Sequence, residues 1–150
     1  MSRTSDKRFT ITCVQTTRQP LALARFSRIA KLALHVLGVR KAAINIVFVG
    51  ESRMAKIATR SGKAGVTNVL AFAYREGREE VLGDVIICVP FAAGEAKKYG
   101  RTTQEHLVAL LIHGIVHLTG RTHKTAQRAK SMESLERKIA LAAGQKSNIS

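Results

Sequence analysis

Three of the five histidines, His113, His117 and His123, have a spacing that suits a metal ion. His113 and His117 are four residues apart, so on a helix both rings project from one face. His123 follows Gly120, and a glycine turn there can bring the third ring in from another direction. Three imidazoles that leave one position open are typical of a catalytic rather than a structural zinc ion. The spacing therefore predicts one zinc ion per chain, although nickel or another transition ion would also suit three imidazoles. The alternative is that these are ordinary histidines on a helix.

The residue after the first histidine argues against a zinc peptidase. Such enzymes carry a glutamate there as the general base, whereas this chain has Gly114. No acidic residue lies between Glu105 and Glu133 to replace it locally. Phosphodiester cleavage places negative charge on phosphoryl oxygens, so it benefits most from cations. A peptidase therefore remains the less favoured interpretation.

The charge balance indicates a polyanionic partner. The chain has 25 Lys and Arg against 10 Asp and Glu, a formal net charge of +15. Such a field attracts nucleic acid or an anionic membrane surface. The alternative is a basic surface with no partner, because charge alone reports association and solubility.

Length and composition favour one globular domain over residues 1–150. A hydrophobic content of 45% excludes wholesale disorder. No apolar run approaches the roughly 20 residues that a bilayer span needs. The polar N-terminus lacks the apolar segment of a secretory signal, so we expect a cytoplasmic protein with no membrane segment. Cys13 and Cys88 form no CxxC pair and are predicted to be buried free thiols.

Hydrophobic periodicity predicts an α/β (α+β) fold in which a central sheet of about four strands is combined with about five helices. The expected strands are residues 9–14, 44–49, 68–73 and 81–89, and the expected helices are residues 20–37, 52–59, 90–99, 102–119 and 124–143. Thr102 and Glu105 have the spacing of a capping box at the start of the long fourth helix. The metal site is expected at the end of that helix.

Two further polar residues receive structural rather than catalytic interpretations. His106 lies seven residues before His113, nearly on the same helix face, and is predicted to be a surface or core histidine rather than a fourth ligand. Asp84, at the start of a predicted strand, could be a turn residue or point toward the cleft, and the turn is the favoured interpretation.

Several sequence motifs resemble those of the YbeY family of bacterial endoribonucleases, also called rRNA maturation factors. They are Thr67-Asn-Val-Leu-Ala-Phe72, Leu82-Gly-Asp-Val-Ile-Ile-Cys88, Glu95-Ala-Lys97 and His113-Gly-Ile-Val-His-Leu-Thr-Gly-Arg-Thr-His123. The resemblance covers about residues 44–143. The chain departs from the family pattern at Thr122, where the family has Asp, at Val66, where it has Pro, and at Ala71, where Ser is common.

The resemblance implies a metal-dependent endoribonuclease that is specific for single strands. It implies a role in maturing the 3′ end of small-subunit rRNA and in ribosome quality control, with pre-rRNA and ribosomal subunits as partners. It also implies that His113 is catalytic and that Arg60, at the position of a functional family arginine, stabilises the phosphate. Arg121 is a second candidate for that role, its alternative being an ordinary surface residue. Arg25, Arg28 and Lys31 would then hold the RNA backbone, although their simplest interpretation is a solvated helix face. The alternative is a zinc-stabilised ribosome-assembly or RNA-binding factor that does not cleave RNA.

Overall fold

Alternating apolar residues along four segments form the sheet that supports the rest of the chain. The computed structural model describes residues 8–62, 65–121 and 125–145. The sheet has the order β1-β2-β4-β3, in which β1, β2 and β4 are parallel and β3 is antiparallel to β4. Its strands are β1 (Phe9–Gln15), β2 (Ala42–Val49), β3 (Val69–Arg75) and β4 (Val81–Cys88). The expectation of a four-stranded sheet is confirmed.

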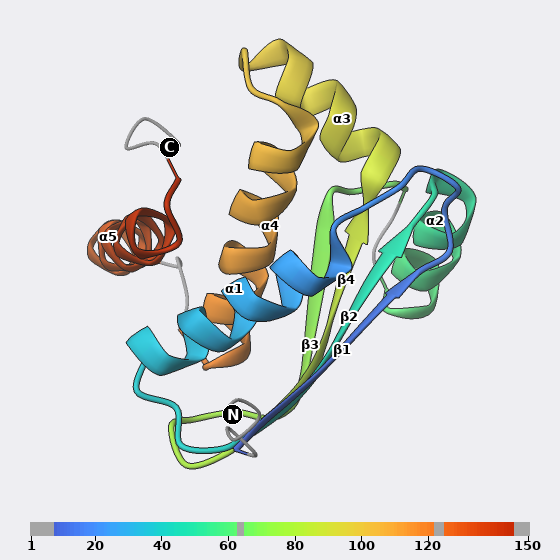
Figure 1. Cartoon of the computed structure of the whole chain (residues 1–150). Helices are drawn as coiled ribbons and strands as arrows, with labels where there is room; N and C mark the ends of the chain where they lie inside the picture. Colours follow the sequence, from blue (N-terminus) through green and yellow to red (C-terminus); the bar gives the residue numbers. More distant parts are fainter. Residues whose placement is uncertain (1–7, 63–64, 122–124, 146–150) are drawn as a thin grey trace.

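Within the described residues, five helices accompany this sheet. They are α1 (Leu23–Val36), α2 (Glu51–Arg60), α3 (Val89–Lys98), α4 (Thr103–Leu118) and α5 (Ala126–Ala142). Figure 1 shows α1 and α4 on one face of the sheet and α2 on the other. Helix α5 contacts α4 and α1, and α3 runs from the end of β4 to the start of α4. The predicted α+β class is therefore correct, with the long fourth helix lying against the sheet.

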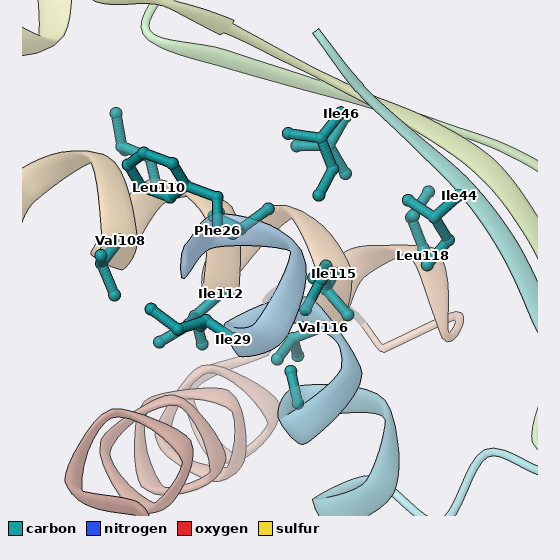
Figure 2. Packing of buried hydrophobic residues seen from close by; sticks show 14 of the residues in the cluster. Phe26, Ile29, Ile44, Ile46, Val108, Leu110, Ile112, Ile115, Val116 and Leu118 are labelled. Carbon is teal, nitrogen blue, oxygen red and sulfur yellow. The ribbon is translucent and has the colours of Figure 1, made fainter. Parts of the chain in front are cut away.

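The main core lies between the sheet and the α1–α4 layer. Phe26 of α1 contacts Phe48 of β2, with ring centroids 4.9 Å apart. Figure 2 shows Phe26 and Ile29 of α1 in one cluster with Ile44 and Ile46 of β2 and with the apolar side chains of α4. Each large aliphatic or aromatic side chain buried here stabilises the fold by roughly 1.5–3 kcal/mol. This core holds α4 in a fixed position relative to the sheet.

A smaller apolar cluster lies on the opposite face of the sheet, under α2. Its buried members include Met54 and Ala58 of α2 together with Ile86 and Cys88 of β4. Helix α2 therefore packs on the face of the sheet that α4 does not contact.

Local signals explain where α4 begins and how closely it approaches the sheet. Thr102 Oγ1 accepts a hydrogen bond from the Glu105 backbone at 3.0 Å, and Glu105 Oε1 accepts one from the Thr102 backbone at 2.9 Å. This confirms the predicted capping box. Further along, a Cβ at Gly114 would lie 2.8 Å from Val85 Cγ1 of β4. Glycine is thus the residue that permits this close contact between α4 and β4.

Two expectations require correction. The first helix begins at Leu23 rather than at residue 20, after an N-cap at Ala22 that has no side-chain hydrogen bond. Asp84 is not in a turn: it lies inside β4, where Asn45 Nδ2 donates to its Oδ1 at 2.9 Å and Tyr74 Oη donates to its Oδ2 at 2.7 Å. Strands on both sides of β4 supply these donors, so Asp84 belongs to a cross-strand polar cluster.

Both cysteines are free, as predicted, and Cys88 is completely buried, but Cys13 is only partly buried, so the prediction of two buried thiols is correct for Cys88 alone. Among the residues that the structure describes, no helix has the length and apolar character needed to cross a bilayer.

Candidate functional site

His113 and His117 lie together on one face of α4, as their spacing predicts. Their ring centroids are 4.6 Å apart and their planes meet at 73°. Both side chains line a cavity of 710 Å³ that is bounded by the start of β3, the end of α3, α4 and α5. The two imidazoles are therefore positioned to bind a common ligand from one helix.

Glu136 of α5 contacts the first of these histidines. Its Oε2 lies 2.8 Å from His113 Nδ1, and the Glu136 side chain is 25% exposed. A carboxylate only accepts hydrogen bonds, so the hydrogen lies on Nδ1 and the lone pair of a neutral ring lies on Nε2. Metal-binding histidines commonly have this arrangement, because a carboxylate on one nitrogen fixes the tautomer at the other. Sequence analysis did not single out Glu136, since nothing in the local pattern places α5 against His113.

The third predicted ligand, His123, lies outside the described residues, as does Thr122. Within residues 8–62, 65–121 and 125–145, no three His, Cys, Asp or Glu side chains converge as a metal site would require. The residues in place nonetheless fit a zinc ion in their chemistry. Two imidazoles lie side by side on a cavity wall, and one of them is oriented by a carboxylate. The three-histidine site stays a prediction.

The cavity is acidic, although the chain as a whole is strongly basic. Three glutamates and two arginines contribute to its walls, a formal charge of −1 in a chain of net +15. These residues are Glu95, Glu133, Glu136, Arg101 and Arg137. A divalent cation bound here would change the formal charge to +1. Metal binding would thus make the cavity attractive to an anionic substrate.

A second polar cluster lies in the same cavity. His106 Nε2 is 2.9 Å from Glu95 Oε1, which also accepts a hydrogen bond from Asn68 Nδ2 at 3.0 Å. On its other side, His106 Nδ1 is 3.1 Å from an Arg101 guanidinium nitrogen. His106 is only 6% exposed. Of the two predicted positions, surface or core, the structure shows the core. Local sequence patterns do not predict this cluster, because Glu95 lies in α3 and Arg101 in the α3–α4 connection. Asn68, which bonds Glu95 rather than His106, directly precedes β3.

The arginines singled out from the sequence lie elsewhere. Arg60 is the last residue of α2 and is exposed, and Arg121 donates to Thr119 Oγ1 at 2.7 Å. Among the described residues, the arginines that line the cavity are Arg101 and Arg137. The role predicted for Arg60 is not tested by these positions.

The basic residues singled out on the first helix are also outside the cavity wall. Arg28 and Lys31 are exposed on α1, and Arg25 is half-buried. None of these three side chains lines the cavity. Their predicted contact with an RNA backbone would therefore be made on the outer surface of α1.

The close packing at Gly114 also bears on the peptidase alternative. Because a Cβ there would lie 2.8 Å from Val85 Cγ1, the glutamate that zinc peptidases place after the first histidine would require Val85 or the helix to shift. The structure gives a packing reason for the glycine, and it leaves this site without a peptidase base at that position.

Comparisons with known proteins agree with these features. The sequence profile of the family described as Endoribonuclease YbeY matches residues 11–144. A protein named Endoribonuclease YbeY from Geobacter sulfurreducens is 35% identical over 130 residues, which cover 81% of this chain and 87% of that relative. One from Neisseria meningitidis is 38% identical over 116 residues, 71% of this chain and 67% of the relative. One from Aromatoleum aromaticum is 41% identical over 78 residues, which span half of each protein.

The fold has a counterpart among solved structures. The solution structure of TM1509 from Thermotoga maritima matches 93% of this chain and 98% of its own, with a TM-score of 0.60 and 15% sequence identity. At that identity, the likeness supports the fold alone.

Proposed function

Because the chain belongs to the YbeY endoribonuclease family, we propose that it is a zinc-dependent endoribonuclease that cleaves single-stranded RNA. Its substrate would be pre-rRNA in the cytoplasm, at the 3′ end of the small-subunit rRNA, and it would also act on ribosomal subunits in quality control. The observation that carries this proposal is the pair His113 and His117 on the wall of a large cavity, with Glu136 bound to His113.

The residues proposed to hold the zinc ion are His113, His117 and His123. A bound zinc ion supplies a Lewis acid that stabilises charge developing on a phosphoryl oxygen. Glu136 keeps the hydrogen of His113 on Nδ1 and so presents the Nε2 lone pair. The surrounding field of net charge +15 favours the approach of RNA, while the acidic cavity favours the cation.

Arg60 is proposed to bind the phosphate that is cleaved, as the family resemblance implies. A guanidinium matches two phosphate oxygens in a planar fork and remains charged. In this chain the residue ends α2 and is exposed, so it is accessible to RNA. The Arg60→Ala variant is expected to lose cleavage while it keeps its fold and its zinc. If Arg60→Ala protein cleaves RNA at the normal rate, this role is wrong.

The test of the proposed function is cleavage of a labelled single-stranded RNA by the purified chain, with the same RNA annealed to its complement as a comparison. The His113→Ala protein, purified in parallel, controls for contaminating nuclease. We expect cleavage of the single strand by the native chain only. Equal cleavage by both preparations, or none by either, would favour an RNA-binding assembly factor that does not cleave.

A further inference from the structure

We propose that Arg101 binds a backbone phosphate of single-stranded RNA in the cavity, and that Asn68, Glu95 and His106 form a chain of hydrogen bonds that positions it. The inference rests on the proposed function, since it names a contact that the RNA makes in the same cavity. Arg101 lines this cavity together with His113, and it lies in the short connection between α3 and α4.

The donor and acceptor types in this chain determine the position of each hydrogen. A guanidinium only donates, so His106 Nδ1 must accept from Arg101 over their 3.1 Å contact. His106 Nε2 then carries its hydrogen and donates it to Glu95 Oε1, 2.9 Å away. Asn68 donates to the same oxygen. The direction of donation is therefore continuous from Arg101 through His106 to Glu95.

Burial makes this chain rigid. His106 is 6% exposed, and loss of either neighbour would leave a buried ring nitrogen without the partner seen here. Leaving a buried polar atom unpaired costs more free energy than a typical hydrogen bond contributes. Glu95 lies in α3, His106 in α4, and Asn68, directly before β3, accepts a backbone hydrogen bond from Cys88 at the end of β4. The guanidinium is therefore held relative to the sheet and not only to its own loop. Such support is typical of a group positioned for a ligand.

The surroundings of Arg101 favour a nucleic-acid strand over a free anion. Tyr99 lines the same cavity, is 58% exposed, and has its ring centroid 5.8 Å from the Arg101 guanidinium carbon. An exposed aromatic ring beside a cation is typical of proteins that bind single strands, because a base can stack while the phosphate meets the charge.

The separation between Arg101 and the His113–His117 pair also favours a nucleic-acid strand. His106 and His113 are seven residues apart on α4, which places them on nearly the same face and about 10 Å apart along the axis. A ligand that contacts both Arg101 and the histidine pair must therefore extend over several ångströms. A strand with successive phosphates meets this requirement, whereas a single inorganic phosphate does not.

The experiment measures binding without metal and without cleavage. A fluorescein-labelled strand of about ten uridines is titrated with protein in EDTA, and its anisotropy is followed from about 50 to 200 mM salt. The variants are Arg101→Gln, Arg101→Lys and His106→Ala, with Arg53→Gln as a matched control on the exposed surface of α2. Thermal unfolding confirms that each variant is folded.

Loss of one phosphate contact has a defined signature. We expect Arg101→Gln to weaken binding by roughly tenfold, equally for strands of uridine and of adenosine. The slope of log affinity against log salt should fall by about 0.7, the value for one phosphate on a single strand. Arg101→Lys should restore the slope and part of the affinity, and Arg53→Gln should change neither. His106→Ala should weaken binding in the native chain but not in the Arg101→Gln background, because His106 acts through Arg101.

The outcomes separate this inference from the proposed function. If the native chain binds and cleaves RNA but Arg101→Gln and Arg101→Lys bind with native affinity and salt slope, the phosphate contact is wrong and the nuclease proposal stands. If the native chain cleaves the strand with zinc but does not bind it in EDTA, the metal-independent contact is wrong and the nuclease proposal stands. If it neither binds the strand in EDTA nor cleaves it with zinc, the proposed function fails and the contact fails with it. If Arg101→Gln weakens only one of the two sequences, Arg101 contacts a base instead, which also overturns the inference.

Discussion

Glu136 of α5 holds Nδ1 of His113 of α4 at 2.8 Å, although the two residues are 23 positions apart in the chain. The contact makes the orientation of a proposed metal ligand depend on how α5 docks against α4. It also explains why an acidic residue is found in the interior-facing part of a helix whose exposed surface is largely basic and polar.

Replacing Glu136 by glutamine should weaken zinc binding without unfolding the protein. A glutamine amide can donate as well as accept, so the hydrogen of His113 would no longer be held on Nδ1. We expect a loss of about 10- to 100-fold in zinc affinity, as for other carboxylates that orient metal-binding histidines. Competition with a chromophoric chelator measures this affinity. Glu133→Gln, on the same helix and cavity wall, is the control and should have a much smaller effect; equal effects of the two variants would contradict the specific role of Glu136.

Placing a methyl group at Gly114 should destabilise the fold. The added Cβ would lie 2.8 Å from Val85 Cγ1, so either the Val85 side chain or α4 must shift. We expect the free energy of unfolding to fall by about 1–3 kcal/mol in denaturant titrations of Gly114→Ala. The matched control is Gly94→Ala in α3, where a Cβ would have no neighbour within 4 Å. There the better helix propensity of alanine should raise the stability by up to about 1 kcal/mol. A Gly114→Ala protein as stable as the Gly94→Ala protein would show that α4 does not pack on β4 as described.

The two thiols should react only at a higher pH in the folded chain than in the unfolded chain. Burial raises the pKa of Cys13, and burial is also the main cause that raises the pKa of Cys88. A raised pKa means that less reactive thiolate is present at any given pH. Alkylation by iodoacetamide, followed by mass spectrometry over a pH series, should proceed at a higher pH in buffer than in denaturant. Cys13, which is partly exposed, should react before the fully buried Cys88. If Cys88 were alkylated faster than Cys13 at neutral pH, that result would contradict the packing of the apolar cluster beneath α2.

Local sequence patterns predict which described segments form helices and which form strands, because hydrophobic periodicity and capping depend on nearby residues. Alternation marked the strands, and the capping pair Thr102 and Glu105 marked the start of α4. Asp84 was misplaced because its partners, Asn45 and Tyr74, come from two other strands. The insertion of β4 between β2 and β3 creates that cluster, and no local pattern encodes this strand order.

In the candidate site, too, local patterns predict some residues, and packing between elements determines the others. The i, i+4 spacing of His113 and His117 is a local property of a helix, and the structure confirms that the two rings are neighbours. Glu136 and Arg101 reach the cavity through packing between elements, so they could be found only once those elements were placed. Even so, the four-residue periodicity that puts Met132, Glu136 and Ala140 on one side of α5 is a signal that could have directed attention to Glu136.

The most direct test of the account is a zinc titration of RNA cleavage. The chain is stripped of metal and zinc is returned in steps while cleavage of a single-stranded RNA is measured, with His113→Ala protein treated identically. The account predicts that cleavage is absent at first, rises with zinc and saturates at one equivalent per chain, and that the variant stays inactive. Undiminished cleavage by the metal-free chain, or a His113→Ala protein that responds to zinc like the native chain, would contradict it.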